Sequence, residues 1–388
     1  MADANFVHLH LHTDYSLLDG ACDITSLVEE AARRKMPAVA VTDHGNLFAA
    51  ANFFHEATTR GVKPIIGCEV YVAPGSRKDR GTADPDSPQA GSGRANHLVL
   101  LCETNEGYRN LLKLVSAGFL EGFYYKPRID YELLAQHSSG LIALSACLRG
   151  SVSDALLAEE YDKARVNAHR LQDIFGKNNF FLELQDQGID VEKRVNREMV
   201  RLSRESGIPL VVTNDCHYLT REDARAHEVL LCIQTGKTMS DTNRMKFATD
   251  QFYFKTAAEM AKVFADVPDA LERTVAIAER CKMKIERVAN PFPEFKVPEG
   301  WTTDTYFEKM SRDGFVARLP ALEQRQKQGR LRHPLAEYEA RLKFEIEMIK
   351  RMRFAGYFLI VSDFIHYARA QGVPVGPGRG SAAGSLVS

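Results

Sequence analysis

Short apolar runs alternate with amphipathic stretches along residues 6–217 of the chain. The segments between the runs, such as ITSLVEEAARRK, carry apolar residues at helical spacing. Continuously apolar strands that alternate with helices are typical of a parallel sheet covered by helices. We therefore predict an α/β fold, either a (β/α) barrel or an open doubly wound sheet, built on seven strands over 6–12, 38–44, 63–73, 97–102, 140–147, 180–185 and 208–217.

The segments outside these runs have different patterns. Residues 73–96 are rich in Gly, Pro, Ser and charged side chains, which predicts a mobile loop between the third and fourth strands. Residues 256–283 predict one or two helices, and 289–301 is proline-rich, as is typical of a linker. Apolar side chains then recur every three or four positions in an amphipathic helix that contains Leu335, Tyr338, Leu342, Ile346 and Ile349.

Composition and charge limit the class of protein. Fifty basic and 51 acidic residues leave a formal charge of −1, so bulk charge does not indicate a nucleic-acid partner, although a site built around metal cations could attract phosphates locally. No apolar run approaches the roughly 20 residues that cross a bilayer, and the start MADANFVHL has no features of a signal peptide. Seven cysteines without a CxxC pair suit a reducing compartment. We expect a cytoplasmic protein without a membrane partner.

Residues that can bind metal ions fall near the ends of the predicted strands. In the first run, alternation with apolar residues should direct His8, His10 and His12 to one face. Since ligands bind at the carboxyl ends of parallel strands, most candidates should meet at one rim, with His8 farther away in a supporting role. His97 is the exception, because it opens its run. The candidates are His10, His12, Asp19, His44, Glu69, His97, Cys147, Asp215 and His217.

Nine candidates are too many for one metal ion, because zinc usually takes four ligands. They could serve two or three ions, and their imidazole, carboxylate and thiolate groups suit Zn²⁺, Mn²⁺ or Fe²⁺. Three carboxylates and one thiolate would supply four negative charges against six positive charges from three ions. The resulting cationic site should prefer a phosphate ester, and clustered metals activate a water and hold both oxygens of an in-line displacement. The pattern therefore favours phosphoester hydrolysis.

The candidates also have purely structural interpretations. His10 and His12 could line a polar strand face, Cys147 could be a buried hydrophobe, and Asp19 could start a turn. Glu69 has no basic neighbour in sequence, so a buried carboxylate there needs a counter-charge, which a metal would provide.

Several neighbours of the candidates are assigned other roles. Asp43 could orient a ligand or cap a helix. Cys68 and Cys216 should point away from the ligands beside them, into the core. Ordinary helix or surface positions are expected for His55, His137, His169, His227, His333 and His366.

The motifs in this order resemble a known family. HLHLHT is similar to the opening motif of the polymerase-and-histidinol-phosphatase (PHP) superfamily. The longer HLHLHTDYSLLDG, followed by VTDHGN, GCEVYV, SAC and NDCHY, resembles the bacterial replicative DNA polymerase III α subunits. The final GYFLIVSDFIHYARAQGVPVGPGRGSAAGSL looks like the start of that family's palm domain. A lone HxH would be weak evidence, whereas the ordered set is specific.

The resemblance implies a fold, an activity and partners. Residues 1–284 would form a distorted (β/α)7 barrel of PHP type, and 285–388 a mostly helical linker and incomplete palm. The nine candidates match family ligand positions, His97 included, and would hold three divalent ions. A metal-activated water among these ligands would make the barrel a 3′→5′ proofreading exonuclease. DNA, a separate proofreading subunit and the sliding clamp would be the partners.

A glycine-rich loop, GPGRGSAAGS at 376–385, offers backbone N–H groups and Arg379 to a phosphate, although it could equally be a flexible turn. By resemblance, Gly380 and Ser381 would contact the triphosphate of an incoming nucleotide, with Gly384 and Ser385 an equally formed pair. The family's palm aspartates, which hold two Mg²⁺ ions, lie beyond this loop. We therefore expect an N-terminal fragment that does not polymerise DNA.

Two other functions remain open from the sequence. The metals could only stabilise the barrel, which would then dock a proofreading subunit. Alternatively, the chain could be a PHP phosphatase that acts on a small molecule, although the palm-like tail argues against this.

Overall fold

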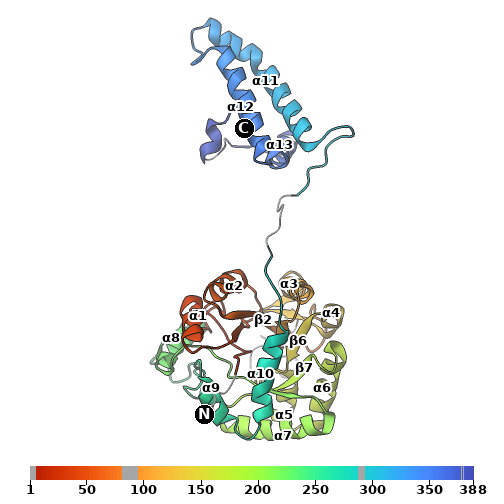
Figure 1. Cartoon of the computed structure of the whole chain (residues 1–388), viewed down its shortest axis with the longest axis vertical. Helices are drawn as coiled ribbons and strands as arrows, with labels where there is room; N and C mark the ends of the chain where they lie inside the picture. The colour runs from red at the N-terminus through yellow and green to blue at the C-terminus, as the bar shows by residue number, and fades with distance from the viewer. Residues whose placement is uncertain (1–5, 81–94, 287–292, 377, 379) are drawn as a thin grey trace. The chain divides into compact units, whose positions relative to one another are not determined.

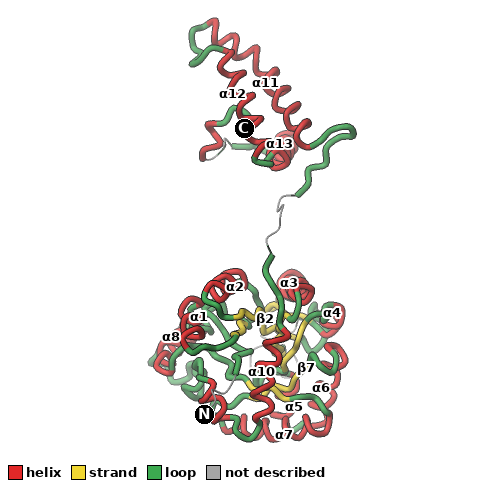
Figure 2. Tube along the Cα trace, viewed as in Figure 1, coloured by secondary structure: helices red, strands yellow, loops and turns green. Residues whose placement is uncertain are grey.

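The computed structural model describes residues 6–80, 95–286, 293–376, 378 and 380–388. The chain divides into two compact units, Met1–Ile285 and Glu286–Ser388, each with its own core. In the larger unit, helices surround a curled sheet (Figure 1, with helices red and strands yellow in Figure 2). Most of the loop expected over 73–96, and part of the linker expected over 289–301, lie outside the described residues.

The larger unit contains one mixed sheet in the order β4-β5-β2-β3-β6-β7-β8, with β1 paired to β2. Its strands are β1 Ala38–Val41, β2 Lys63–Val72, β3 Asn96–Cys102, β4 Phe123–Tyr124, β5 Lys126–Ile129, β6 Leu141–Leu144, β7 Phe180–Leu184 and β8 Leu210–Val212. Its helices are α1 Ile24–Arg33, α2 Ala50–Thr59, α3 Asn105–Leu120, α4 Tyr131–Gln136, α5 Ser151–Leu157, α6 Tyr161–Phe175, α7 Asp190–Ser206, the 3₁₀ helix η2 Arg221–Asp223, α8 Ala224–Thr235, α9 Ala257–Val263 and α10 Pro268–Arg280. The predicted α/β class is confirmed.

The segment before α1 closes this sheet. On one side, the Thr42 N–H after β1 donates to the Leu11 carbonyl at 2.9 Å. On the other side, the His12 N–H donates to the carbonyl of Cys216, after β8, at 2.8 Å. Backbone hydrogen bonds therefore continue from β8 through residues 6–12 to β1, and the curled sheet becomes a barrel.

Two strands, β3 and β4, run against the others. The prediction of an all-parallel sheet is wrong for β3, which pairs antiparallel with both β2 and β6. Because β3 is reversed, its amino end lies at the rim where the neighbouring strands β2 and β6 have their carboxyl ends. His97 stands opposite Tyr71 at this end, which explains in physical terms why a candidate ligand opens its strand.

Residues 6–12, which were predicted to form the first strand, form no regular strand and have only an isolated bridge at Leu11. Ala40 and Thr42, two positions apart, donate to the carbonyls of His8 and Leu11, three positions apart, so the segment carries one extra residue. This bulge breaks the expected alternation. The His8 side chain packs away from the candidate ligands, with Nε2 2.8 Å from the Lys255 carbonyl, and the expectation that it shares a face with His10 is wrong.

Apolar side chains fill the barrel and the space beneath its helices. Val7, Leu9 and the inward residues of the strands form an interior cluster, which Ile277 and Ala278 of α10 complete. In Figure 1, α10 crosses the middle of the ring of helices. A second cluster lies between the sheet and the surrounding helices. The interior is therefore a packed core, and only its rim is free for a polar site.

The smaller unit contains α11 Thr303–Lys327, α12 Leu335–Arg351, α13 Ala355–Ala370 and the 3₁₀ helix η3 Gly380–Gly384. The helix predicted around Leu342 is confirmed as α12. It buries Leu342 and Ile346 against Phe307 of α11 and Leu359 of α13.

Candidate metal centre

Glu69, near the end of β2, lies at the middle of the candidate ligands. One of its oxygens is 2.8 Å from His97 Nδ1 and 3.6 Å from His10 Nε2. The other is 2.6 Å from His44 Nδ1 and 3.6 Å from His12 Nε2. Glu69 is only 1 % exposed, so these imidazoles or bound cations must supply its counter-charge.

Asp215 approaches the same histidines from beyond β8. Its Oδ1 is 3.1 Å from His12 Nε2, 3.3 Å from His10 Nε2 and 3.7 Å from His217 Nδ1. The Asp215 backbone has a φ of 49°, a left-handed conformation that aspartate tolerates better than most residues. Strain of this kind is common where a side chain is held for function.

The remaining candidates complete the cluster. Asp19 Oδ2 is 3.2 Å from His44 Nε2, and Asp19 Oδ1 is 3.9 Å from His217 Nε2. Cys147, in the loop after β6, places Sγ 3.7 Å from His97 Nδ1. All nine side chains predicted to bind metal are thus brought together at one rim.

Several polar atoms of this cluster approach one another closely but make no well-aligned hydrogen bond. Among the described residues, buried atoms without a hydrogen bond include His10 Nε2, His12 Nε2, Asp19 Oδ1, both ring nitrogens of His44, Glu69 Oε2 and Asp215 Oδ1. Each such atom costs roughly 1–3 kcal/mol when it is left unsatisfied. Cations between these donors would satisfy them together, and the donor chemistry fits this interpretation.

Six of the nine candidates form three overlapping groups, and within each group the donor atoms lie within 4.8 Å of one another. Glu69 belongs to two groups, and so do His12 and His44. The groups are His10–His12–Glu69, His44–Glu69–His97 and His12–His44–His217. Shared members are the arrangement expected of a centre with neighbouring ions.

Comparisons with known proteins agree with this geometry. A model of the PHP domain matches residues 8–187, and a model of the bacterial DNA polymerase III alpha NTPase domain matches residues 305–388. A DNA polymerase III subunit alpha from Treponema pallidum is 44 % identical over 389 residues, which are 100 % of this chain and 32 % of that protein. Those from Mycobacterium tuberculosis and Helicobacter pylori are 44 % and 42 % identical, over 100 % and 99 % of this chain and 33 % and 32 % of their own lengths.

The chain belongs to the DNA polymerase III α-subunit family. It spans about a third of the length of the curated relatives that it matches. The larger unit carries the PHP match and is called the PHP unit below. Among solved structures, a two-domain protein from Bacteroides vulgatus containing a predicted PHP-like metal-dependent phosphoesterase is 14 % identical, with a TM-score of 0.32 over 74 % of this chain and 72 % of that one. No described helix is both long and apolar enough to cross a membrane.

Charges in the PHP unit hold protons on two of the imidazoles. Burial would lower the pKa of His10, but the carboxylates of Asp215 and Glu183 raise it to about 10. Burial would also lower the pKa of His44, but the carboxylates of Glu69 and Asp19 raise it to about 10. Both rings are therefore protonated at neutral pH until a cation displaces the proton.

The pKa of His12 is lowered, whereas that of Cys147 is raised. Burial and the neighbouring His44 lower the pKa of His12 to about 3, so its ring is neutral. Its Nδ1 lies 3.1 Å from Ser16 Oγ, which leaves Nε2 directed at the carboxylates. Burial and Glu69 raise the pKa of the Cys147 thiol well above its ordinary range, so a thiolate ligand here requires a nearby cation.

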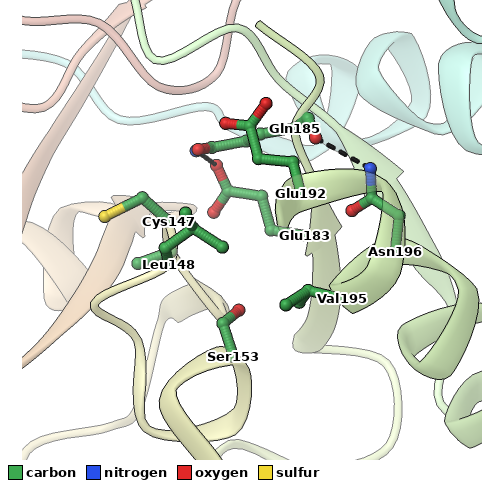
Figure 3. Close-up of a pocket in the computed structure, with 9 residues that line it drawn as sticks. Cys147, Leu148, Ser153, Glu183, Gln185, Glu192, Val195 and Asn196 are labelled. Atoms are coloured by element: carbon green, nitrogen blue, oxygen red, sulfur yellow. Dashed lines mark hydrogen bonds between the residues drawn. The ribbon is translucent and has the colours of Figure 1, made fainter. Parts of the chain in front are cut away.

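Glu183 of β7 supports His10 and is absent from the predicted set. Its Oε1 accepts hydrogen bonds from His10 Nδ1 at 2.7 Å, from Gln185 at 3.0 Å and from the Thr213 hydroxyl. Figure 3 shows Glu183 and Gln185 in a small pocket that Cys147 also lines. The bond at Nδ1 directs Nε2 of His10 toward the centre. A lone carboxylate in the apolar run FFLEL is the same signal that singled out Glu69.

Asp43 supports the loop that carries Asp19. Its carboxylate accepts hydrogen bonds from the Thr13 N–H at 2.7 Å, the Thr13 hydroxyl at 2.8 Å and the Ser16 hydroxyl at 2.7 Å. The following helix, α2, has Ala49 at its N-cap. Of the two roles predicted for Asp43, the structure therefore favours support of the site.

His227 is a second supporting residue that the sequence did not reveal. It is 2 % exposed on α8, and Nε2 lies 2.6 Å from the Asp19 carbonyl. Its ring is 5.6 Å from that of His217. The expectation of an ordinary helix or surface histidine is wrong, whereas Cys68 and Cys216 are buried as expected.

The glycine-rich loop belongs to the smaller unit. Residues Gly380–Gly384 form η3, Arg379 lies outside the described residues, and the Ser381 side chain is likewise not described. The Ser385 hydroxyl donates to Glu345 Oε2 on α12 at 2.8 Å. This bond anchors the segment to its own unit, and a triphosphate contact of the loop stays a prediction.

Proposed function

We propose that the PHP unit is a metal-dependent phosphodiesterase that removes nucleotides from DNA 3′ ends. The observation that carries the proposal is the set of converging, buried donor atoms at the rim that make no hydrogen bond, including His12 Nε2, Glu69 Oε2 and Asp215 Oδ1. A purely structural polar cluster would be expected to satisfy its own atoms.

We infer that three divalent ions, of Zn²⁺, Mn²⁺ or Fe²⁺, bind at the three overlapping groups, which contain six of the nine donors. Asp19, Cys147 and Asp215 would complete the coordination of these ions. Bound ions of this kind acidify a water and neutralise the charge that develops on phosphoryl oxygens. The protein supplies the orientation: Glu183 fixes the His10 ring, and Asp43 fixes the loop of Asp19. His44 and Asp19, with side chains 15 % and 20 % exposed, reach solvent and would face the substrate.

The names of the matched relatives add a setting for this activity. They are subunits of DNA polymerase III, from which we propose that this sequence acts on DNA beside other replicase subunits. We propose a proofreading subunit and a sliding clamp as partners, and Mg²⁺-dependent polymerisation as the activity of the longer relatives. In the glycine-rich loop, we propose that the triphosphate of a nucleotide is contacted by Gly380, Ser381, Arg379, Gly384 and Ser385.

The test is release of nucleotides from a single-stranded oligonucleotide labelled at its 5′ end, with Zn²⁺ or Mn²⁺ added. His12→Ala should abolish release, because it removes a donor shared by two groups. His55→Ala, an exposed histidine on α2, is the matched control and should not change the rate. Equal rates for His12→Ala and the unsubstituted protein would contradict the proposal. Full metal occupancy without any hydrolysis would favour the structural docking function instead.

A further inference from the structure

Three exposed phenylalanines lie in a row on the PHP unit. Phe48, Phe119 and Phe123 are 60 %, 41 % and 50 % exposed. The ring centroids of Phe48 and Phe119 are 6.4 Å apart, and those of Phe119 and Phe123 are 6.1 Å apart, with planes inclined by only 24°. These residues, called the aromatic strip, come from the loop before α2, the last turn of α3 and β4. Aromatic rings gathered on a surface are typical of a binding site.

The aromatic strip lies beside the metal centre. Gly45 follows His44 directly, and a Cβ added to Gly45 would lie 2.7 Å from Cγ of Pro127. Pro127 is in turn the partner of Phe123 in the β4–β5 hairpin. One proline therefore touches both the chain next to a candidate ligand and the strand that carries the strip.

The centre reaches solvent on this same side. The His10 and His12 side chains are fully buried, whereas that of His44 is 15 % exposed. The ring of Tyr71 stacks beside that of His44, with centroids 6.2 Å apart. Lys126 in turn places Nζ 5.5 Å from the centroid of the Tyr71 ring. A positive charge thus lies beside the Tyr71 ring, on the strand β5 that pairs with β4.

The hairpin beside the strip is strained. Tyr125, at the tip between β4 and β5, has a φ of 58° and is 56 % exposed. A bulky residue in the left-handed region is unfavourable, and such strain is found where a side chain is held for binding. The strain here presents another aromatic ring to solvent next to Lys126.

We propose that the aromatic strip stacks the unpaired bases of a single-stranded DNA end whose terminal phosphodiester lies at the metal centre. The inference rests on the proposed phosphodiesterase function and specifies its substrate as an unpaired end. Flat exposed rings bind bases of any sequence, and a nearby cation attracts the backbone. The bases of a duplex end are already stacked on one another, so a paired end would not use the strip.

The test measures binding of the whole chain, depleted of metal so that no strand is cut, to a fluorescent oligothymidylate. The double variant Phe119→Ala/Phe123→Ala should raise the Kd about tenfold or more, because each stacked base contributes roughly 1–3 kcal/mol. Phe364→Ala, which alters a 55 % exposed phenylalanine of the smaller unit, is the matched control and should leave the Kd unchanged.

A second measurement needs no variant. A strand of equal length whose last nucleotides lack bases keeps its phosphates, and it should bind the unsubstituted protein about as weakly as the intact strand binds the double variant. Equal binding of intact and base-free strands would overturn the inference. Unchanged binding by the double variant would overturn it too, and would indicate that the strip serves a protein partner.

The outcome is separable from that of the proposed function. With metal restored, the double variant should hydrolyse methyl p-nitrophenyl phosphate, a small ester without a base, at the unsubstituted rate. If the unsubstituted protein does not hydrolyse this ester or DNA, the phosphodiesterase function fails. The binding measurements, made without metal, still decide whether the strip stacks bases.

Discussion

At the scale of single residues, the centre depends on which nitrogen of each histidine faces the donors. His10 directs Nε2 inward because its Nδ1 donates to Glu183, which is itself held by Gln185. Orientation of a ligand by a carboxylate behind it also raises the basicity of that ligand. Glu183 is therefore a positioning residue for the metal centre.

Glu183→Gln keeps the size of the side chain and removes its charge, so the His10 ring loses its strongest acceptor. We expect metal affinity to fall about 10- to 100-fold, as measured by competition with a coloured chelator. Glu205→Gln, an exposed carboxylate on α7, is the matched control. Equal affinity of Glu183→Gln and the unsubstituted protein would show that Glu183 does not orient His10.

Metal binding should also release protons. The pKa values of His10 and His44 are raised to about 10 by the carboxylates around them, so both rings carry a proton at about pH 8 when no metal is present. An entering cation must displace these protons, and metal affinity should therefore decrease as the pH falls below 10. Calorimetry in two buffers of different ionisation enthalpy measures the release; identical binding heats in both buffers would contradict it.

At the scale of elements, the site depends on loops fixed by buried hydrogen bonds. The loop between the first strand and α1 carries Asp19, and the Asp43 carboxylate holds its start through Thr13 and Ser16. This bonding joins the loop to the end of β1. The hydrogen bonds that make the loop rigid therefore also hold Asp19 in place.

Asp43→Ala removes the acceptor of three hydrogen bonds and leaves buried donors of Thr13 and Ser16 without partners. We expect the free energy of unfolding to fall by roughly 2–4 kcal/mol, measured by urea denaturation. Asp43→Asn keeps one acceptor oxygen and should lose less. A loss in Asp43→Ala no larger than in Asp43→Asn would contradict the assigned role.

Many of the helices and strands could be predicted from the sequence, because apolar runs and helical spacing are local signals. The reversal of β3 and the bulge at His8 were not, since they depend on which strands pair across the barrel. The convergence of the candidate ligands could be predicted because strand ends collect at a rim. Glu183 was missed although the lone carboxylate in FFLEL is the same signal that singled out Glu69. His227 was missed because it lies on a helix with no unusual pattern.

At the scale of the molecule, the rim that carries the site rests on the apolar core inside the barrel. Ile277 of α10 is 1 % exposed and packs within the interior cluster. Ile277→Ala should lower the free energy of unfolding of the PHP unit by roughly 2–5 kcal/mol, because the cavity cannot be refilled by rigid strands. Val316→Ala, at an exposed position of α11, should have almost no effect in the same denaturation experiment.

If Ile277→Ala lowered stability no more than Val316→Ala, α10 would not be a structural part of the barrel. Because the smaller unit has its own core around Phe307 and Ile346, its unfolding should not change in Ile277→Ala. Proteolysis followed by mass spectrometry can assign each transition to its unit.

The most direct test of the metal centre is anomalous X-ray scattering from crystals grown with Zn²⁺ or Mn²⁺. The predicted result is three peaks at the rim, each within about 2.0–2.3 Å of donors among the nine side chains. Glu69 should contact more than one ion, since it belongs to two of the three donor groups. Crystals grown with metal that show no anomalous peak at the rim would contradict the account.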